Sequence, residues 1–291
     1  MERRGRKIYR LYDIIFFMKL LYNMHTHTYR CGHATGTDEE YVKNAIKAGF
    51  KVLGFSDHAF FPNVVHKGMR GNYEELDNYI SSVLKLKKKY HKKIDIKLGF
   101  EIEYQENYYG FYRYLLQEKG FDFLILGQHV TYSLDGKPNY YFNGKDDIEG
   151  IKKYKDDLIK GMETGLFLYV CHPDLFMNHV TKITPEIESV CDEICKASAR
   201  LNIPLEVNLG GMRFANLISE IKGTQPYPNY YFWQFAKKNN CKCVIGIDAH
   251  NPNELLEEDK INFAYKFIEK NGLTLEDDLK MINLNYTDGR K

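Results

Sequence analysis

The sequence lacks a long uninterrupted hydrophobic stretch. Its most apolar run, Ile14 to Met18, is bounded by Asp13 and Lys19 and is far shorter than the roughly 20 residues that a membrane-spanning helix needs. The basic start followed by this run imitates a secretory signal only weakly, because charges interrupt the stretch and no small-residue cleavage site follows. The sequence therefore predicts neither a transmembrane segment nor a signal peptide.

A surplus of charge of one sign is also missing. Lys and Arg number 41 and Asp and Glu number 39, which gives a formal net charge of +2. This balance gives no reason to expect nucleic acid or a membrane as a partner. The six cysteines form no C-x-x-C pair and no dense framework for a chain of 291 residues, so we expect reduced thiols in a cytoplasmic protein.

Aromatic residues are abundant, with 23 Tyr and 18 Phe, and 44% of the chain is hydrophobic. A disordered chain would be poorer in such residues, and this length is sufficient for a full hydrophobic core. We expect a single domain over residues 19–291, preceded by an N-terminal extension at residues 1–18. Met18 is an alternative start, because the chain reads as structured from Lys19 onward.

Short apolar segments alternate with amphipathic segments along the chain. Helices are predicted after the capping box at Thr37, over 72–89, and after Thr184. The candidate strands are Leu20–Met24, Val52–Phe55, Ile94–Phe100, Phe123–Leu126, Phe167–Val170, Pro204–Val207 and Cys243–Ile247. Strands that alternate with helices predict an α/β protein with a parallel sheet, and about seven such units favour a closed or nearly closed barrel.

Residues able to bind metal ions occur at one kind of place, the carboxyl end of each candidate strand. In chain order they are His25 and His27, Asp57 and His58, Glu101 and Glu103, His129, His172, Glu206 and Asn208, and Asp248 and His250. In a β/α barrel the carboxyl ends of the strands converge on one face, where such folds place their sites. A polar residue at the end of one strand is unremarkable. Packing alone does not explain metal-binding residue types at the ends of all the candidate strands.

The spacing within pairs supports a metal site. In His25-Thr26-His27 the two imidazoles point to the same side of an extended segment, and Asp248-Ala249-His250 repeats this geometry. The candidate ligands are His25, His27, His33, His58, Glu101, His129, His172, Asp248 and His250, whereas His66, His91 and His179 are left outside the set. Nine ligands exceed the four or five that one ion takes, so they predict two or three divalent ions. We expect Glu101 to bridge two ions, with Asp248 as a second candidate bridge.

These residues stand in motifs whose order is informative. The motifs are Asn23-Met24-His25-Thr26-His27, His33, Phe55-Ser56-Asp57-His58, Gly99-Phe100-Glu101, Gly127-Gln128-His129, Val170-Cys171-His172-Pro173, Leu205-Glu206-Val207-Asn208 and Ile247-Asp248-Ala249-His250. Over residues 20–252 this series resembles that of the polymerase and histidinol phosphatase (PHP) superfamily. The segment 205–229 is most similar to the stand-alone histidinol-phosphatase branch. Gln128 departs from that branch, where a small residue is expected.

The resemblance implies a distorted (β/α)7 TIM-like barrel with a trinuclear site, and hydrolysis of L-histidinol phosphate to L-histidinol and phosphate in histidine biosynthesis. It would place one ion among His25, His27, Glu101 and Asp248. A second ion would lie among Glu101, His129 and His172, and a third among His33, His58 and His250. The chemistry of the ligands suits zinc, iron or manganese alike.

A mechanism follows as a hypothesis. A hydroxide bridging two ions would attack phosphorus while the third ion holds a phosphoryl oxygen. Asp248 or His250 would protonate the leaving alkoxide. Arg213 is a candidate phosphate clamp, although a structural ion pair explains it equally well. Glu103 would orient a ligand or contact the ammonium group of the substrate. Glu206 and Asn208 are expected to support ligating imidazoles.

Other functions remain open at this point. A phosphodiesterase or exonuclease acting on nucleic acid, or a phosphatase of another monoester, would use the same site. The near-neutral charge disfavours nucleic acid, because its binding depends on phosphate neutralisation. An amidohydrolase would bridge its ions with a modified lysine rather than with Glu101. A non-enzymatic module is disfavoured because all nine ligand positions are intact.

Overall fold

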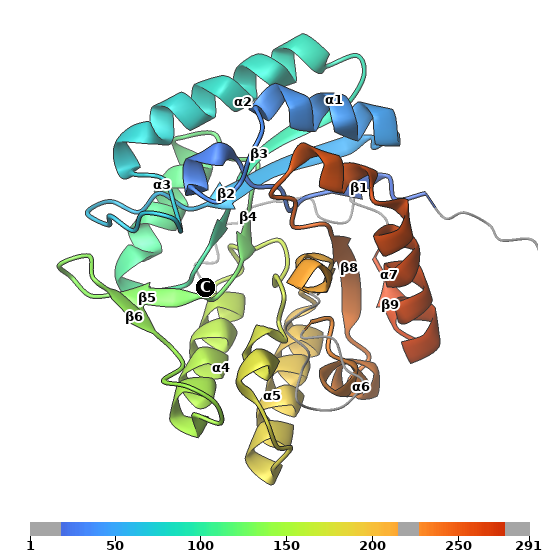
Figure 1. The fold of residues 1–291 in the computed structure, drawn as a ribbon. Coiled ribbons are helices and arrows are strands. Elements are labelled where there is room, and N and C mark those ends of the chain that lie inside the picture. Colours follow the sequence, from blue (N-terminus) through green and yellow to red (C-terminus); the bar gives the residue numbers. More distant parts are fainter. Residues whose placement is uncertain (1–18, 215–226, 277–291) are drawn as a thin grey trace, which may run out of the picture.

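The computed structural model describes residues 19–214 and 227–276 of the chain. The expected extension, residues 1–18, lies outside the described residues, as do 215–226 and 277–291. Parallel strands curl around a central space, and helices lie on the outside of the curl (Figure 1). The structure is therefore the α/β type that the alternating pattern predicts.

Two groups of parallel strands form the curled sheet. The first group runs in the order β1 (Tyr22–Asn23), β2 (Val52–His58), β3 (Asp95–Ile102) and β4 (Phe123–Leu126); the second contains β7 (Leu205–Asn208), β8 (Lys242–Gly246) and β9 (Thr274–Leu275). Parallel bridges join Leu126 to Val170 and Val170 to Leu205, and a further bridge joins Thr26 to Ala249. The two groups are thus in contact at both edges.

Two segments differ from the predicted strands, one within the curled sheet and one in a separate two-stranded hairpin. The segment 167–171 bonds to both neighbours, as in Leu168 N to Leu124 O at 2.8 Å and Val170 N to Pro204 O at 3.0 Å, but it is too irregular to form a strand. A short antiparallel hairpin, β5 (Val130–Tyr132) with β6 (Pro138–Tyr140), was not predicted. It follows directly after His129.

Seven α-helices occur in the described part of the chain: α1 (Asp38–Ala48), α2 (Leu76–Tyr90), α3 (Tyr109–Gln117), α4 (Ile148–Glu163), α5 (Pro185–Leu201), α6 (Tyr230–Lys238) and α7 (Glu258–Asn271). Helix α1 begins at the predicted capping box of Thr37 and Glu40 and ends at Gly49, whose φ of 85° suits glycine. Thr184 caps α5 as predicted. Over residues 19–214 and 227–276, every helix is too short or too polar to span a membrane.

The alternation of side chains along the strands separates two hydrophobic layers. Outward-facing residues of β2 and β3, such as Phe55 and Phe100, join the large core between sheet and helices. The inner layer is a smaller cluster made of Tyr22, Met24, Phe123, Ile125, Leu168, Tyr169, Cys171 and Val244. The Phe123 ring fills the space over Gly99, where an added Cβ would lie 2.4 Å from Cζ. Beyond this layer, the inner face becomes polar.

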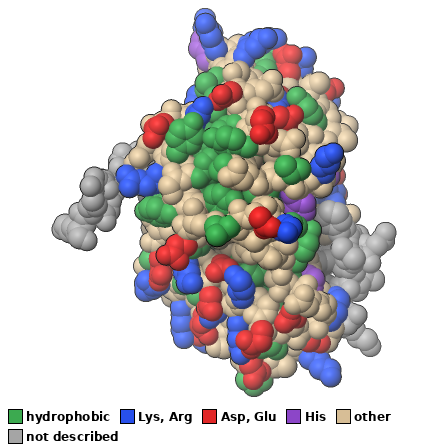
Figure 2. Space-filling model, turned by 90° about the vertical axis from the view of Figure 1, so that its left-hand side faces the viewer, with side chains coloured by type: hydrophobic (Ala, Val, Ile, Leu, Met, Phe, Trp, Pro, Cys, Tyr) green, Lys and Arg blue, Asp and Glu red, His purple; other side chains and the backbone are tan. Residues whose placement is uncertain are grey.

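Charge is mixed on the face of the molecule shown in Figure 2. Hydrophobic side chains gather near the middle of this view, and acidic and basic side chains are interspersed around them. The described residues on this face form no continuous basic track of the kind that binds a phosphate backbone.

Candidate metal centre

Three strands deliver ligands from the inner face of the sheet. The sequence placed His58 and Glu101 after their strands. In the structure β2 extends through His58 and β3 through Ile102, so both residues lie within the strands. In β3, Gly99 faces the same side as Glu101, because alternate residues share a face. Asp248 follows β8 and has a φ of 54°, a left-handed conformation that costs free energy for a non-glycine residue and is typical of functional sites.

The predicted pair His25 and His27 meets two carboxylates. The Nε2 atoms of the two imidazoles lie 3.1 Å apart. Asp248 Oδ1 lies 3.4 Å from Nε2 of His25 and 3.1 Å from Nε2 of His27. Glu101 Oε2 is 3.5 Å from each of the same nitrogens. All four side chains are buried, so the predicted set for one ion is brought together.

A second group shares Glu101 through its other oxygen. His172 Nε2 lies 2.7 Å from Glu101 Oε1, and His129 Nε2 lies 3.4 Å from the same atom. The two imidazoles are 3.2 Å apart at their Nε2 atoms. Glu101 thus presents one oxygen to each group, which is the arrangement expected of a bridging carboxylate.

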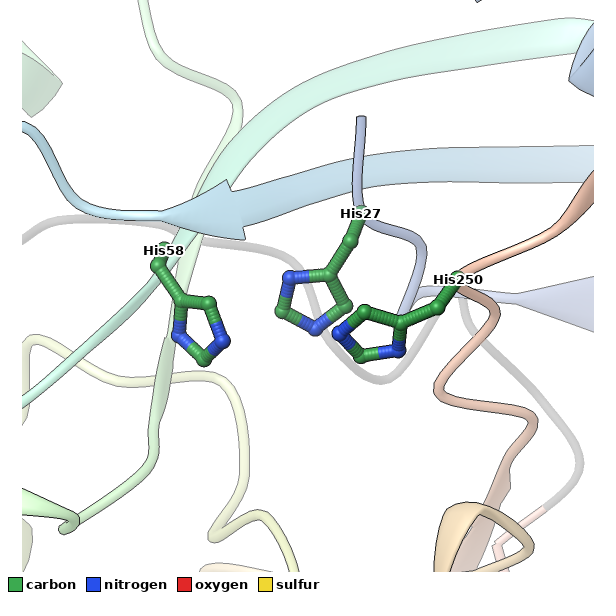
Figure 3. A group of neighbouring side chains, drawn as sticks. All are labelled: His27, His58 and His250. Atoms are coloured by element: carbon green, nitrogen blue, oxygen red, sulfur yellow. The ribbon is translucent and has the colours of Figure 1, made fainter. Parts of the chain in front are cut away.

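The remaining imidazoles lie on the other side of His27. His33 Nε2 is 3.0 Å from His250 Nε2. The ring of His27 stacks on that of His250 with 4.0 Å between centroids, and its centroid is 4.3 Å from that of His58. Figure 3 shows His27, His58 and His250 entering one space from different segments, and ligand atoms of these three lie within 4.8 Å of one another. The third predicted set is therefore close together, with His27 as its neighbour.

The donor atoms fit bound cations better than a hydrogen-bonded cluster. Glu101 Oε2 and Asp248 Oδ1 are buried and have no hydrogen-bond partner among the described residues. Each is nevertheless surrounded by imidazole nitrogens, such as His58 Nδ1 at 3.0 Å from Glu101 Oε2. Ligands about 2.0–2.2 Å from a shared ion lie about 3 Å from one another. These residues therefore fit a centre of divalent metal ions.

The protonation states favour metal binding. Burial disfavours the charged form of Glu101, but His129, His25 and His58 outweigh this and hold its pKa well below the ordinary value. Burial and the charge of His27 lower the pKa of His250 to about 3. The carboxylate is thus anionic and this imidazole neutral at neutral pH, which are the forms that coordinate metal.

His27 behaves differently in the metal-free protein. Burial alone would lower its pKa, but the neighbouring carboxylates of Asp248, Asp57 and Glu101 outweigh burial and raise it to about 9. A proton therefore compensates the carboxylates there when no cation is bound, and metal binding must displace it.

Further acids lie behind the ligating imidazoles. Glu206 Oε1 is 2.8 Å from His25 Nδ1, and Asn208 Nδ2 donates to Glu206 Oε2 at 2.7 Å, so Glu206 contacts a candidate ligand directly and Asn208 contacts it through Glu206. Asp57 Oδ1 lies 3.7 Å from His27 Nδ1. Sequence reasoning placed Asp57 at a strand end but gave it no role; its position directly before His58 was the available signal.

A cavity of about 480 Å³ opens over the ligands. Its walls are His33, His58, Met69, Glu101, His129, His172, Leu175, Gly210, Arg213, Tyr227, Asp248, His250 and Glu254. This volume suits a small molecule. Seven of the nine predicted ligands line the cavity wall, whereas His25 and His27 are completely buried beneath it.

The structure gives Arg213 and Glu103 different surroundings. Arg213 Nε pairs with Glu257 at 3.1 Å and Glu254 at 3.3 Å, while its Nη2 has no hydrogen-bond partner in the described part of the chain. Glu103 is buried against Arg70 and His129 and is not among the residues that line the described cavity. Its surroundings favour the orienting role, and its contact with substrate stays a prediction.

Curled parallel strands with imidazole and carboxylate ligands at their carboxyl ends define an α/β protein with a multi-ligand metal centre. Comparison with known families agrees: the family model described as PHP domain matches residues 23–209. The chain belongs to the PHP domain family. The matched range contains seven of the nine candidate ligands and stops before Asp248 and His250.

Curated relatives cover most of the chain. A protein from Deinococcus radiodurans named "Probable histidinol-phosphatase" is 26% identical over 240 residues, which is 81% of this chain and 88% of that protein. One of the same name from Schizosaccharomyces pombe is 22% identical over 269 residues, 86% of each chain. The crystal structure of histidinol phosphate phosphatase from Lactococcus lactis, complexed with zinc, L-histidinol and phosphate, has a TM-score of 0.66 at 18% identity and covers 88% of this chain and 95% of that chain. At such identity this likeness shows the fold.

Proposed function

We propose that this protein hydrolyses L-histidinol phosphate to L-histidinol and phosphate. The observation that carries the proposal is the convergence of nine imidazole and carboxylate ligands beneath one small-molecule cavity. The histidinol-phosphatase names of relatives that match over 81% and 86% of the chain support the choice of substrate. Phosphate monoesters are anions that resist attack by water, and clustered cations overcome this resistance.

We propose two or three divalent ions, of zinc, iron or manganese, held by the ligand sets predicted from the sequence. Contacts of both Glu101 oxygens with imidazoles support its role as the bridge. His27 Nε2 lies 3.1 Å from Asp248 Oδ1, so His27 would hold the same ion as Asp248; a neutral imidazole offers one lone pair and would hold one ion. When bound, such ions activate water as the nucleophile and neutralise phosphoryl oxygens.

The chain's own groups complete the chemistry. Arg213 is proposed to donate to a phosphate oxygen through Nη2, since its Nε and Nη1 are already held by Glu257 and the carbonyl of Ile247. Asp248 or His250 is proposed to deliver the proton that the leaving alkoxide needs, by direct transfer or through water, because both lie in the cavity wall. The lowered pKa values of both groups favour the route through water. His25 and His27 are buried beneath the cavity. They are proposed to bind cations and to keep water out of the base of the cavity.

We also propose that residues 19–291 form one domain built as a distorted (β/α)7 TIM-like barrel. The three isolated bridges between the strand groups support closure. A core cluster that extends from Leu20 to Ile268 supports the single domain.

A substrate panel on protein of known metal content tests this function. We expect the highest kcat/KM for L-histidinol phosphate among phosphate monoesters, and little turnover of a phosphate diester or single-stranded DNA. His172→Ala should abolish turnover, whereas His91→Ala should not, because His91 is an exposed histidine at the end of α2. A preference for the diester or the DNA would replace this function with that of a phosphodiesterase or nuclease.

A further inference from the structure

A buried arginine lies behind one of the candidate ligands. Arg70 belongs to an irregular segment between β2 and α2, yet its side chain is completely buried. Burying a guanidinium group costs free energy unless it is paired and hydrogen-bonded. Every nitrogen of Arg70 has a partner: Nη1 donates to Ala59 O at 2.9 Å, Nε to the Tyr132 hydroxyl at 2.7 Å, and Nη2 to Glu103 Oε1 at 2.7 Å.

The acid that pairs with Arg70 also contacts a ligand. Glu103 Oε1 lies 3.2 Å from His129 Nδ1, so one oxygen receives a donor from each side. This contact places the imidazole proton on Nδ1 and leaves the Nε2 lone pair free. Nε2 lies 3.4 Å from Glu101 Oε1, on the side where a cation would bind.

The position of Arg70 is itself fixed by its surroundings. Its guanidinium carbon lies 5.4 Å from the ring centroid of Phe61 and 5.1 Å from that of Tyr132, which is a cation–π distance. His66 connects the hydroxyls of Tyr132, at 2.9 Å, and Tyr140, at 3.1 Å. Because Tyr132 and Tyr140 belong to the β5–β6 hairpin, the hairpin holds the guanidinium against Glu103.

We infer that Arg70 is a positioning residue of the metal centre, which acts through Glu103 to hold His129 in the orientation that coordinates a cation. His129 is the most exposed of the ligands around Glu101, with 19% of its side chain accessible. Its orientation therefore depends on an outer partner, as that of the buried His25 depends on Glu206, whose Oε1 lies 2.8 Å from His25 Nδ1. The inference rests on the metal centre of the proposed function and not on the identity of the substrate.

A double-mutant cycle tests the inference, with affinity for Zn²⁺ measured by competition with a chelator. Arg70→Met should weaken the affinity about 10–100-fold, the usual cost of losing such an outer partner. In a His129→Ala background the same substitution should cause no further loss beyond about twofold, because the group it positions is absent. Arg70→Lys keeps the charge but not the three-way contact, so its affinity should be intermediate.

Controls separate positioning from general stability. Arg200→Met removes an exposed Arg–Glu pair with Glu163 and should leave the affinity unchanged. If Arg70→Met does not fold by circular dichroism, the Arg70→Met/Glu103→Gln protein removes the unpaired acid, and its affinity should still fall at least 10-fold. Wild-type affinity in a folded Arg70 variant, or equal losses in both backgrounds of the cycle, would overturn the inference. Zinc binding without hydrolysis of L-histidinol phosphate would instead refute the proposed function alone.

Discussion

At the scale of single residues, the centre depends on the two carboxylates. Glu101 contacts His172 through one oxygen and His58 through the other. The imidazoles around it could each be replaced by another nitrogen or by water, but a carboxylate alone combines negative charge with two donor atoms that reach different ions. Glu101 is therefore the residue whose loss should disrupt the centre most.

Glu101→Gln should lower both metal content and phosphatase activity by more than about 100-fold. Loss of a group that merely orients a ligand already lowers metal affinity or activity about 10–100-fold. The amide keeps the size of the side chain but removes the charge. Elemental analysis and hydrolysis of L-histidinol phosphate measure the two effects. Glu118→Gln, in an exposed position after α3, is the matched control and should leave both unchanged. Full metal content in the Glu101 variant would contradict the bridging role.

Asp174 offers a pH-dependent prediction. It is buried, and it accepts from Asn229 N at 2.6 Å and from Trp233 Nε1 at 3.1 Å. Burial raises its pKa from 3.8 to about 7, although these hydrogen bonds oppose the shift. Folding thus favours the protonated acid, so its contribution to stability is complete below about pH 4 and is lost as the pH rises through 7. Asp174→Asn, which cannot ionise, should gain stability relative to wild type over that range in urea unfolding. A pH-independent difference would contradict this.

At the scale of secondary structure elements, glycines on neighbouring segments make room for the buried acids. A Cβ on Gly127, which follows β4, would lie 2.3 Å from Glu101 Oε1, and one on Gly246 in β8 would lie 1.7 Å from Glu206 Oε1. Both acids are also held by imidazoles, as in the 2.7 Å contact of Glu101 with His172. They therefore cannot move aside without disturbing a ligand.

Gly127→Ala should displace Glu101 and weaken metal affinity by about 10-fold or more. Losing a group that orients a metal ligand has an effect of this size. Gly110→Ala is the matched control, because it lies in α3 with open space around it and alanine favours a helix by about 1 kcal/mol. Chelator competition and thermal unfolding measure the two effects. Equal metal affinity in both variants would show that the close approach at Gly127 is unimportant.

The elements also show how much the sequence could predict. Periodicity and caps predict α1, α5 and most strands, because these signals are local. The irregular segment 167–171 and the β5–β6 hairpin depend on contacts with distant neighbours, such as Leu126 with Val170. The convergence of the candidate ligands could be predicted, because metal coordination demands particular residue types and these occur at strand ends. Arg70 was not, because nothing in its local sequence shows that it would be buried beside Glu103.

At the scale of the whole molecule, the centre joins segments that are distant in the chain. His25 follows β1 and Asp248 follows β8, yet their side chains lie 3.4 Å apart. Bound cations would therefore connect both groups of strands at the open end of the inner face. Without cations, the buried acids have only the neighbouring imidazoles as charge partners. Burying them in this state costs electrostatic free energy and destabilises the folded protein.

Removal of metal should consequently lower the melting temperature by on the order of 10 °C. A ligand at 1,000 times its Kd stabilises the folded state by about 4 kcal/mol, and each kcal/mol shifts the melting temperature by about 2–4 °C in a large domain. Differential scanning calorimetry with and without EDTA measures the shift, and readdition of Zn²⁺ should reverse it. The Glu101→Gln protein should respond less to EDTA. An unchanged melting temperature in protein that had lost its metal would contradict a structural role for the centre.

Elemental analysis of the purified wild-type protein shows whether the nine candidate ligands form one multinuclear centre. We expect two or three equivalents of zinc, iron or manganese per chain after exhaustive dialysis. Less than one equivalent, even after reconstitution with each of these metals, would contradict such a centre.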